Sequence, residues 1–336
     1  MKNIIILFAA TLLFSGCLED HSDLIPDRAL DGEPSGAVIN ANVLEVDEGV
    51  LSLMLDVYVV NGQGNFVSGL SGTNFNVENV ESISLSFGDS ISFTNVSVGA
   101  SRTERKGNYA ATLLLDQSGS ISNTDPNNTR VEAAKIFSGA LGNNDYALVS
   151  SFQQDDVTIH TGYTQDTAVL FQSLDDLLFQ QEGQTPLYSS VSRMVEYTRE
   201  NAPGNNHAII LFTDGIQEPE LSDEARVLKE LTDFASSQDV EIYTIGLSRN
   251  VNFSVLSSMA TNTGGAFMWA EDTRQLITMF GTLGDLLSGN ALYYQTQWQA
   301  IISSGTWQSG QSYVGEVVIT LSDGSQFIVP FEFVVP

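Results

Sequence analysis

Five oxygen-bearing side chains stand out because each follows a predicted strand or precedes a predicted helix. They are Asp116, Ser118, Ser120, Thr185 and Asp214. The carboxyl ends of parallel strands share one edge of a sheet, and ligands bind in the crevice beyond that edge. Hydroxyl and carboxylate oxygens, with no nitrogen or sulfur ligand, suit Mg²⁺, Ca²⁺ or Mn²⁺ and argue against zinc. The residue types therefore predict a site for a hard divalent cation.

The elements around these residues alternate between apolar runs and helical periods from residue 108 to residue 288. Near-continuous apolar runs predict buried strands at 109–115, 146–152, 207–213 and 240–247. Helical periods lie at 128–141, 166–180, 186–200, 221–237, 252–261 and 273–287. Such alternation predicts an α/β fold, namely a doubly wound, mostly parallel sheet with helices on both faces.

The spacing of the five side chains resembles that of von Willebrand factor type A (VWA) domains with a metal-ion-dependent adhesion site (MIDAS). The family pattern is Asp-x-Ser-x-Ser, followed by a distant Thr and a distant Asp. All five positions match in the expected strand context, and the resemblance covers roughly residues 108–288. Ala270, before the last helix, also fits, whereas the family more often has Gly where Gln184 stands. The resemblance implies a Rossmann-like VWA domain.

The resemblance also implies a role for each residue. The hydroxyls of Ser118, Ser120 and Thr185 would coordinate the ion, expected to be Mg²⁺ with Ca²⁺ or Mn²⁺ as alternatives. Asp116 and Asp214 would lie behind them and act largely through water. Neutral ligands leave the cation electrophilic. A small divalent ion has about six coordination positions, and water molecules occupy those that the protein does not fill. A Glu or Asp carboxylate of a partner protein can replace one water, so we expect a binding module and not an enzyme.

A helix cap is the alternative explanation for the first part of this motif. Ser and Asp are common N-cap residues, so Ser120 or Asp125 could simply cap a helix after the first strand. Thr185 and Asp214 stand in matching positions far along the chain, and their agreement favours the metal site.

The segments that flank the α/β region are typical of a β-sandwich, with short strands between Gly and Asn turns. In residues 37–100 the expected strands are 51–60, 66–67, 74–77, 83–87 and 91–98. The layout from Leu55 to Val77 resembles the Ig-like segment that often precedes a VWA domain. Residues 289–336 contain a hairpin signal at Asp323-Gly324 but too few strands for a fold of their own. We therefore expect both segments to form one Ig-like sandwich, with the VWA domain (108–288) inserted after a linker at 101–107.

The N-terminus has the features of a bacterial lipoprotein. Residues 1–16 combine Lys2, a short apolar run and small residues, which predicts a signal peptide. Ser15-Gly16-Cys17 resembles a lipobox, which implies cleavage before Cys17 and lipid attachment to it; an ordinary signal peptide with an incidental Cys is the alternative. The lipid would anchor the protein, with residues 17–36 as a tether. The expected location is the bacterial cell envelope, on the periplasmic or surface face of the outer membrane.

Charge and motif content exclude other classes of function. The 336-residue chain has 13 Lys and Arg against 41 Asp and Glu, a formal net charge of -28, which repels nucleic-acid phosphates. An α/β-hydrolase would need a Gly-x-Ser-x-Gly elbow and a late His, but the last His is His207. The leading expectation is a lipid-anchored adhesion or protein–protein interaction module. The alternative is an assembly or scaffold factor that docks a partner in the same cell.

Overall fold

The computed structural model describes residues 33–47, 49–82, 91–103, 107–154, 156–287, 289, 291–303 and 306–336. The predicted signal peptide, Cys17 and the strand predicted at 83–87 lie outside these residues. In the described ranges, no helix combines the length and the apolar character needed to cross a membrane.

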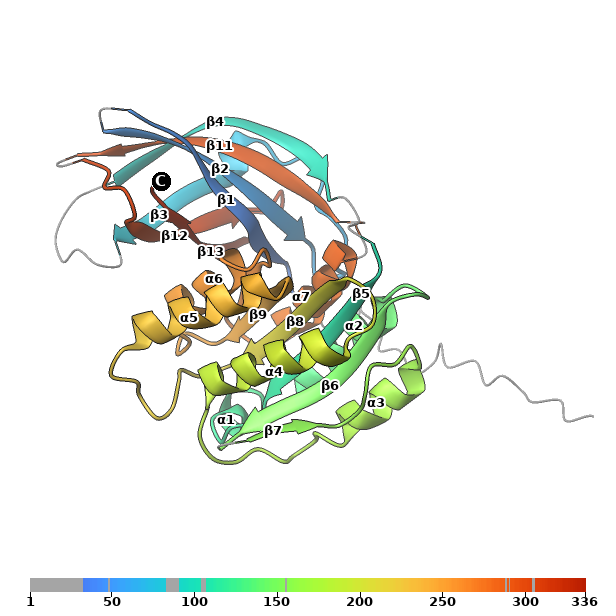
Figure 1. Ribbon diagram of the computed structural model, residues 1–336. Coiled ribbons are helices and arrows are strands. Elements are labelled where there is room, and N and C mark those ends of the chain that lie inside the picture. The colour runs from blue at the N-terminus through green and yellow to red at the C-terminus, as the bar shows by residue number, and fades with distance from the viewer. Residues whose placement is uncertain are drawn as a thin grey trace, which may run out of the picture.

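A mixed sheet of ten strands runs through the molecule (Figure 1). Its central strands, from β10 to β6, are parallel to one another; β9, β8, β5 and β6 were predicted from their apolar runs, and β10 was not. β7 at one edge and the strands beyond β10 at the other are antiparallel to their neighbours. The order across the sheet is β4 (Ile91–Arg102), β11 (Leu292–Ile302), β2 (Val50–Val60), β1 (Ser35–Asp47), β10 (Phe267–Ala270), β9 (Val240–Leu247), β8 (Asn206–Thr213), β5 (Tyr109–Asp116), β6 (Tyr146–Gln153) and β7 (Asp156–Ile159).

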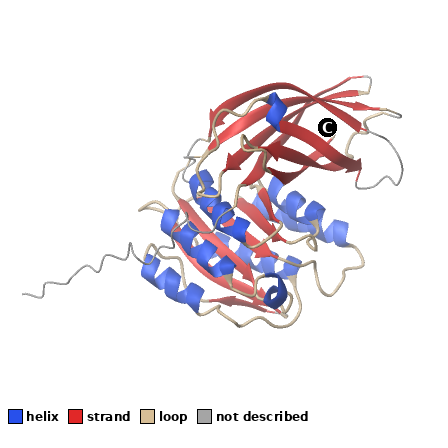
Figure 2. Ribbon diagram, turned by 180° about the vertical axis from the view of Figure 1, so that it is seen from behind, coloured by secondary structure: helices blue, strands red, loops and turns tan. Residues whose placement is uncertain are grey.

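Helices cover both faces of the parallel strands (Figure 1, Figure 2). Alternate residues of β5 point to opposite faces, so Leu113 and Leu115 join one apolar core while Leu114 joins the other. The first core is closed by α2 (Thr129–Ala140), α3 (Thr167–Asp175) and α7 (Arg274–Leu287). The second is closed by α4 (Leu187–Asn201), α5 (Glu224–Ser237) and α6 (Phe253–Thr261). The short helix α1 (Ile121–Thr124) follows β5 directly.

The strands before β5 and after α7 form what we call the terminal-strand region. A second sheet has the order β13 (Gln326–Val334), β12 (Ser312–Thr320) and β3 (Phe75–Ser82), and the 3-10 helix η2 (Gly72–Asn74) precedes β3. One apolar core joins this sheet to β2 and β11, with Trp298 and Tyr294 among its buried side chains. β11 lies between β2 and β4, and β12 pairs with β3, so both ends of the chain contribute to each sheet.

The terminal-strand region is continuous with the parallel strands through β1. Ala37 pairs with Met268 and Val38 with Phe267 across the β1–β10 contact. β1 begins at Ser35, inside the predicted tether, and β4 continues to Arg102, inside the predicted linker. This edge-to-edge pairing was not predicted, because it depends on two strands more than 200 residues apart.

Three local predictions differ from the structure. Residues 66–67 form no strand, because Phe66 makes only an isolated bridge to Val60 after a tight turn. The helix predicted at 166–180 ends at Asp175, and Phe179 adopts a left-handed φ of 59° that no helix allows. The helix predicted from 221 begins at Glu224, because the Asp223 side chain accepts a hydrogen bond from Arg226 N and caps it.

Candidate metal centre

The two carboxylates of the predicted site lie on neighbouring strands. β5 and β8 are parallel, with Leu115 paired to Phe212, so Asp116 at the end of β5 lies beside the end of β8. Asp214 follows β8 directly. The third segment is held close by a hydrogen bond of 3.0 Å from Gly119 N to Gly183 O, two residues before Thr185. The topology thus brings all three predicted segments to one edge of the sheet.

Hydrogen bonds connect the side chains at this edge. Ser118 N donates to Asp116 Oδ1 at 2.7 Å, and the Ser118 and Ser120 hydroxyl oxygens are 3.1 Å apart. Ser120 Oγ donates to Asp214 Oδ1 at 2.7 Å. A methyl carbon placed on Gly215 would lie 3.3 Å from Thr185 Oγ1 and 3.8 Å from Ser120 Oγ, which locates the Thr185 hydroxyl in the same cluster. We call these five residues, Asp116, Ser118, Ser120, Thr185 and Asp214, the metal edge.

The helix-cap alternative accounts for Asp125 but not for Ser120. Asp125 Oδ1 accepts a hydrogen bond from Thr129 N at 2.7 Å, and its Oδ2 accepts one from Arg130 N at 3.1 Å, at the start of α2. Ser120 stands at the N-cap of α1, yet its side chain makes no capping hydrogen bond. Its hydroxyl points to Asp214 instead.

Two threonines that sequence reasoning missed complete the hydrogen bonding of the carboxylates. Thr213 Oγ1 donates to Asp116 Oδ2 at 2.5 Å, and Thr124 Oγ1 donates to Asp214 Oδ2. Thr213 is adjacent to Asp214 in the chain, and Thr124 lies four residues after Ser120 on α1. Hydroxyl residues at these spacings from the motif are the signal that could have identified them.

A buried arginine, Arg130, holds the loop that carries the motif. Its side chain is fully buried, and Arg130 Nη1 donates to Asp125 Oδ2 at 2.9 Å. Arg130 Nη2 donates to Gln117 Oε1, and Gln117 Nε2 in turn donates to Leu177 O. The charge of Arg130 also reaches the carboxylates of the metal edge, where it favours their ionised forms.

Burial dominates the electrostatics of the two carboxylates. Asp116 is 0% exposed and Asp214 1% exposed. Burial raises the pKa of Asp116 to about 7, against the opposing effect of hydrogen bonds from Thr213 and Ser118. Burial likewise raises the pKa of Asp214. A nearby cation would offset the cost of ionising both groups.

The donor set of the metal edge fits a hard divalent cation. It offers hydroxyl and carboxylate oxygens, and Ser120 is exposed, so the cluster is open to solvent on one side. In the part of the chain that the structure describes, no group of three or more His, Cys, Asp and Glu side chains could hold a metal ion. The chemistry of this edge therefore differs from that of a closed structural metal site.

Comparison with known proteins identifies the family. The chain is similar in fold to a von Willebrand factor type A protein from Catenulispora acidiphila, at 12% identity, covering 91% of this chain and 74% of that one with a TM-score of 0.47. It is also similar to proximal thread matrix protein 1 of the mussel byssus, solved with a zinc-occupied MIDAS motif (18% identity, 60% and 50% coverage, TM-score 0.45). The pilus adhesin SpaC of Lactobacillus rhamnosus GG gives 10% identity, 89% and 47% coverage and a TM-score of 0.46.

The chain spans about half the length of the mussel protein and of the pilus adhesin. No curated protein matches the sequence. The family model of the von Willebrand factor type A domain matches residues 112–282, which is half of the chain. The protein therefore belongs to the von Willebrand factor type A domain family.

Proposed function

We propose that this protein is an interaction module that binds a divalent cation, Mg²⁺ before Ca²⁺ or Mn²⁺, through the five residues of the metal edge. The observation that carries the proposal is the pair of buried carboxylates, which meet the hydroxyls of Ser118, Ser120 and Thr185 at an edge open to solvent. Two buried carboxylates repel each other and are costly to ionise without a counter-charge. A divalent cation supplies that charge.

A partner protein completes the site in this proposal. The hydroxyl groups donate no negative charge to the ion, so the ion keeps affinity for one more anionic oxygen. A Glu or Asp side chain of the partner supplies that oxygen on the exposed side near Ser120. The site performs no catalysis, because the cation serves as a bridge between two proteins and no group is positioned by it for reaction. Adhesion to another cell and docking within the same envelope both use this chemistry.

Calorimetric titration with MgCl₂ tests the metal site. The wild-type chain should bind one ion, and Asp116→Asn should remove the heat of binding because a neutral amide cannot replace the carboxylate. Asp233→Asn is the matched control, since it removes an exposed carboxylate of α5 that pairs with Lys229. Absence of divalent-ion binding to the wild type would contradict the proposal.

Capture from the native envelope tests the role of the site. The wild-type protein should retain a partner in Mg²⁺ and release it in EDTA, whereas Asp116→Asn should retain none. A partner from the same cells indicates docking within the envelope, and a partner from other cells or from matrix indicates adhesion. Capture that persists in EDTA would leave the metal site in place but refute its role in partner binding.

We also propose a lipid anchor at Cys17, which lies outside the described residues, and hence an outer-membrane location. The lipobox-like Ser15-Gly16-Cys17 supports this proposal. Cys17→Ser should move the protein from the detergent phase to the aqueous phase of a phase-separating extraction. Unchanged partitioning would refute the anchor.

We propose further that the terminal-strand region is an Ig-like β-sandwich. Its support is the shared apolar core between two sheets, each built from both ends of the chain. Deletion of residues 289–336 removes β11 from between β2 and β4, so limited proteolysis should then cut the remaining terminal strands. An isolated segment 37–100 that unfolds cooperatively on its own would contradict this organisation.

A further inference from the structure

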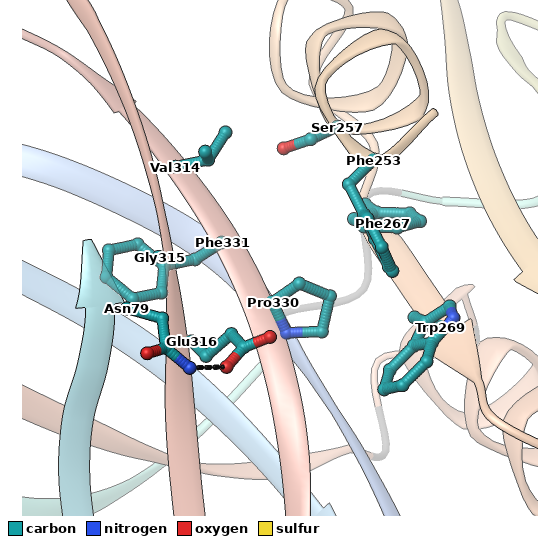
Figure 3. A pocket seen from close by; sticks show the side chains of 10 residues that line it. All are labelled: Asn79, Phe253, Ser257, Phe267, Trp269, Val314, Gly315, Glu316, Pro330 and Phe331. Atoms are coloured by element: carbon teal, nitrogen blue, oxygen red, sulfur yellow. Dashed lines mark hydrogen bonds between the residues drawn. The ribbon is translucent and has the colours of Figure 1, made fainter. Parts of the chain in front are cut away.

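A cavity of about 90 Å³ lies where the terminal-strand region meets the VWA domain (Figure 3). Figure 3 shows side chains of α6 and β10 facing those of β12 and β13 across it. Its apolar lining consists mainly of Phe253, Phe267, Trp269, Val314, Pro330 and Phe331. The space is large enough for one apolar side chain of a partner.

Aromatic rings form the wall on the VWA side. The ring centroids of Phe253 and Trp269 are 5.3 Å apart, and those of Phe253 and Phe267 are 6.1 Å apart, both in edge-to-face arrangements. Trp269 Nε1 donates to Ser248 O at 2.8 Å, so the one polar group of this ring has its partner within the protein. The wall is therefore fixed in shape and needs no further hydrogen bond, which suits an apolar ligand group.

Two carboxylates lie at the rim on the other side. Glu316 of β12 and Glu78 of β3 are directly opposite each other in the register of the two strands. Each is held by an amide: Asn79 Nδ2 donates to Glu316 Oε2, and Asn76 Nδ2 donates to Glu78 Oε1, both at 2.6 Å. In the described part of the chain, neither carboxylate forms an ion pair with a Lys, Arg or His. Like charges opposite each other on paired strands are destabilising, so a bound cation would be favourable here.

A second, wider hollow of about 570 Å³ shares Trp269 with the cavity and is also lined by Glu78. Glu33 and Glu271 line this hollow too, but Arg274 and Arg249 pair with them at 2.7 Å and 2.8 Å. Unneutralised charge is therefore concentrated at Glu78 and Glu316. We call the cavity, the hollow and these two carboxylates the acidic groove.

One wall residue of the acidic groove, Trp269, lies in the same row of the sheet as Thr213, the neighbour of Asp214. Trp269 pairs with Gly246 in β9, and Gly246 pairs with Thr213 in β8, so Trp269 and Thr213 lie in one row across the sheet. Two strand spacings separate them, about 10 Å.

We infer that the acidic groove binds an extended segment of a partner protein that carries an apolar side chain next to Lys or Arg. The apolar side chain enters the cavity beside Phe253 and Trp269. The neighbouring cationic side chains reach Glu316 and Glu78, whose charges have no cationic partner in the described chain. Charge complementarity selects this occupant, since an acidic segment would be repelled both at the rim and by a chain of net charge -28.

Fluorescence anisotropy with a labelled peptide, Gly-Lys-Phe-Lys-Gly, tests the inference on the full folded chain at physiological salt. A peptide with Gly in place of Phe has the same charge and should bind at least ~tenfold more weakly, because it cannot fill the cavity. A peptide with Glu in place of both Lys should not bind. Equal binding of the Phe and Gly peptides, or no binding of the Phe peptide, would overturn the inference.

Variants of the protein locate the binding site. The double variant Glu78→Gln with Glu316→Gln removes both rim charges and should weaken binding ~tenfold. Glu196→Gln with Glu200→Gln removes two exposed charges of α4 instead and should change affinity less than ~twofold. Val314→Phe fills the cavity and should abolish binding, and an unchanged melting transition shows that it is folded. Unchanged affinity in the rim and cavity variants would overturn the inference.

The proposed binding at the acidic groove and the proposed binding at the metal edge can be tested independently. Binding of the Phe peptide should be the same in Mg²⁺, in EDTA and in Asp116→Asn, because the groove uses no cation. Loss of peptide binding in EDTA would instead place the peptide at the metal edge and overturn the assignment to the groove.

Discussion

The metal edge and the acidic groove hold their negative charges in opposite ways. Asp116 and Asp214 are buried, are bonded to threonine hydroxyls and have raised pKa values. Glu78 and Glu316 instead lie at the rim of an apolar cavity. Buried charge needs compensation from inside or from a bound ion, whereas charge at a rim is hydrated and available to a partner. The two regions therefore hold negative charge by different physical means, one at the end of the ten-stranded sheet and the other at a rim whose carboxylates belong to the three-stranded sheet.

The two regions also depend on the surrounding fold in different ways. At the metal edge, Arg130, Asp125 and Gln117 form a buried network under the motif loop. The groove depends on how the VWA domain and the terminal-strand region meet, and Ser258 of α6 contributes to that contact by donating to Glu332 Oε2 of β13 at 2.9 Å. Changes in the buried network of Arg130 should therefore affect stability strongly, and changes at the groove rim should mainly affect binding.

The largest expected effect is that of Arg130→Ala. Removal of this side chain leaves Asp125 as a buried carboxylate without its cation, which costs about 3–5 kcal/mol of unfolding free energy. Urea denaturation measures this cost, and Mg²⁺ affinity should fall as well because the motif loop loses its support. Arg226→Ala is the control: Arg226 is 58% exposed and pairs with Asp223 and Glu230 at the surface, where solvent screens the charges, so its loss should cost far less than that of Arg130. Equal costs for both variants would remove the contrast between buried and exposed charge.

The next effect is stabilisation by the metal. An ion that binds only the native state adds about 2.7 kcal/mol at a free concentration of ~100 times its dissociation constant. The melting temperature should therefore rise in MgCl₂ and return in EDTA, and Asp116→Asn should show no such rise. Glu316→Gln, at the groove, should respond to Mg²⁺ as the wild type does. A response lost in both variants would mean that the two regions are coupled.

The pH dependence follows from the raised pKa of Asp116, about 7 in the folded chain against ~3.9 for an unfolded Asp. Between these values the native state holds a proton that the unfolded state has lost. The contribution of Asp116 to the stability of the metal-free protein is therefore full below about pH 4 and is lost as pH rises through about 7. Metal binding requires the ionised carboxylate, so Mg²⁺ affinity should change in the opposite sense and drop ~100-fold from pH 8 to pH 5.

Two measurements test the predicted direction of these pH dependences. Urea denaturation in EDTA at pH 5 and pH 8 gives the metal-free stability, and calorimetry over the same range gives the affinity. In Asp116→Asn, the decrease in metal-free stability from pH 5 to pH 8 should be smaller. The remaining decrease is due to other buried acids such as Glu332, because burial also raises the pKa of its carboxyl group. A metal-free protein that is more stable at pH 8 than at pH 5 would contradict the electrostatic account of the metal edge.

The metal edge could be predicted from the sequence because its information is local. Asp116, Ser118 and Ser120 lie within five residues after an apolar run, and Asp214 directly follows another. Strand and helix periods then suffice to place these residues at one edge of a parallel sheet. The burial of Asp116 and Asp214 and their hydrogen bonds from threonines could not be predicted, because they depend on how α1 and β8 pack around the carboxylates.

The acidic groove could not be predicted, because its residues come from four elements far apart in the sequence. Phe253, Trp269, Val314 and Pro330 belong to α6, β10, β12 and β13, and no spacing relates them. Their meeting follows from the β1–β10 pairing, which rests on only two residue pairs. β10 itself has four residues, too short for a period of two to stand out from a buried helix segment. Long-range register is the part of this fold that single-sequence patterns cannot supply.

The smallest expected effect is that of Glu316→Gln on stability, and its sign is informative. Glu316 and Glu78 are opposite each other across β12 and β3, and like charges in that position cost a few tenths of a kcal/mol. Gln keeps a carbonyl oxygen that can accept from Asn79 Nδ2, so the variant should be more stable than the wild type by about 0.2–0.5 kcal/mol. Parallel urea denaturation with Glu196→Gln as control resolves such a difference, since the control should not change stability. A gain in stability together with weaker peptide binding would show that the charge pair at the rim serves recognition at the expense of the fold. A loss in stability would instead mean that the carboxylate of Glu316 stabilises the paired strands. The difference between the groove rim and the metal edge would then be smaller than their geometry indicates.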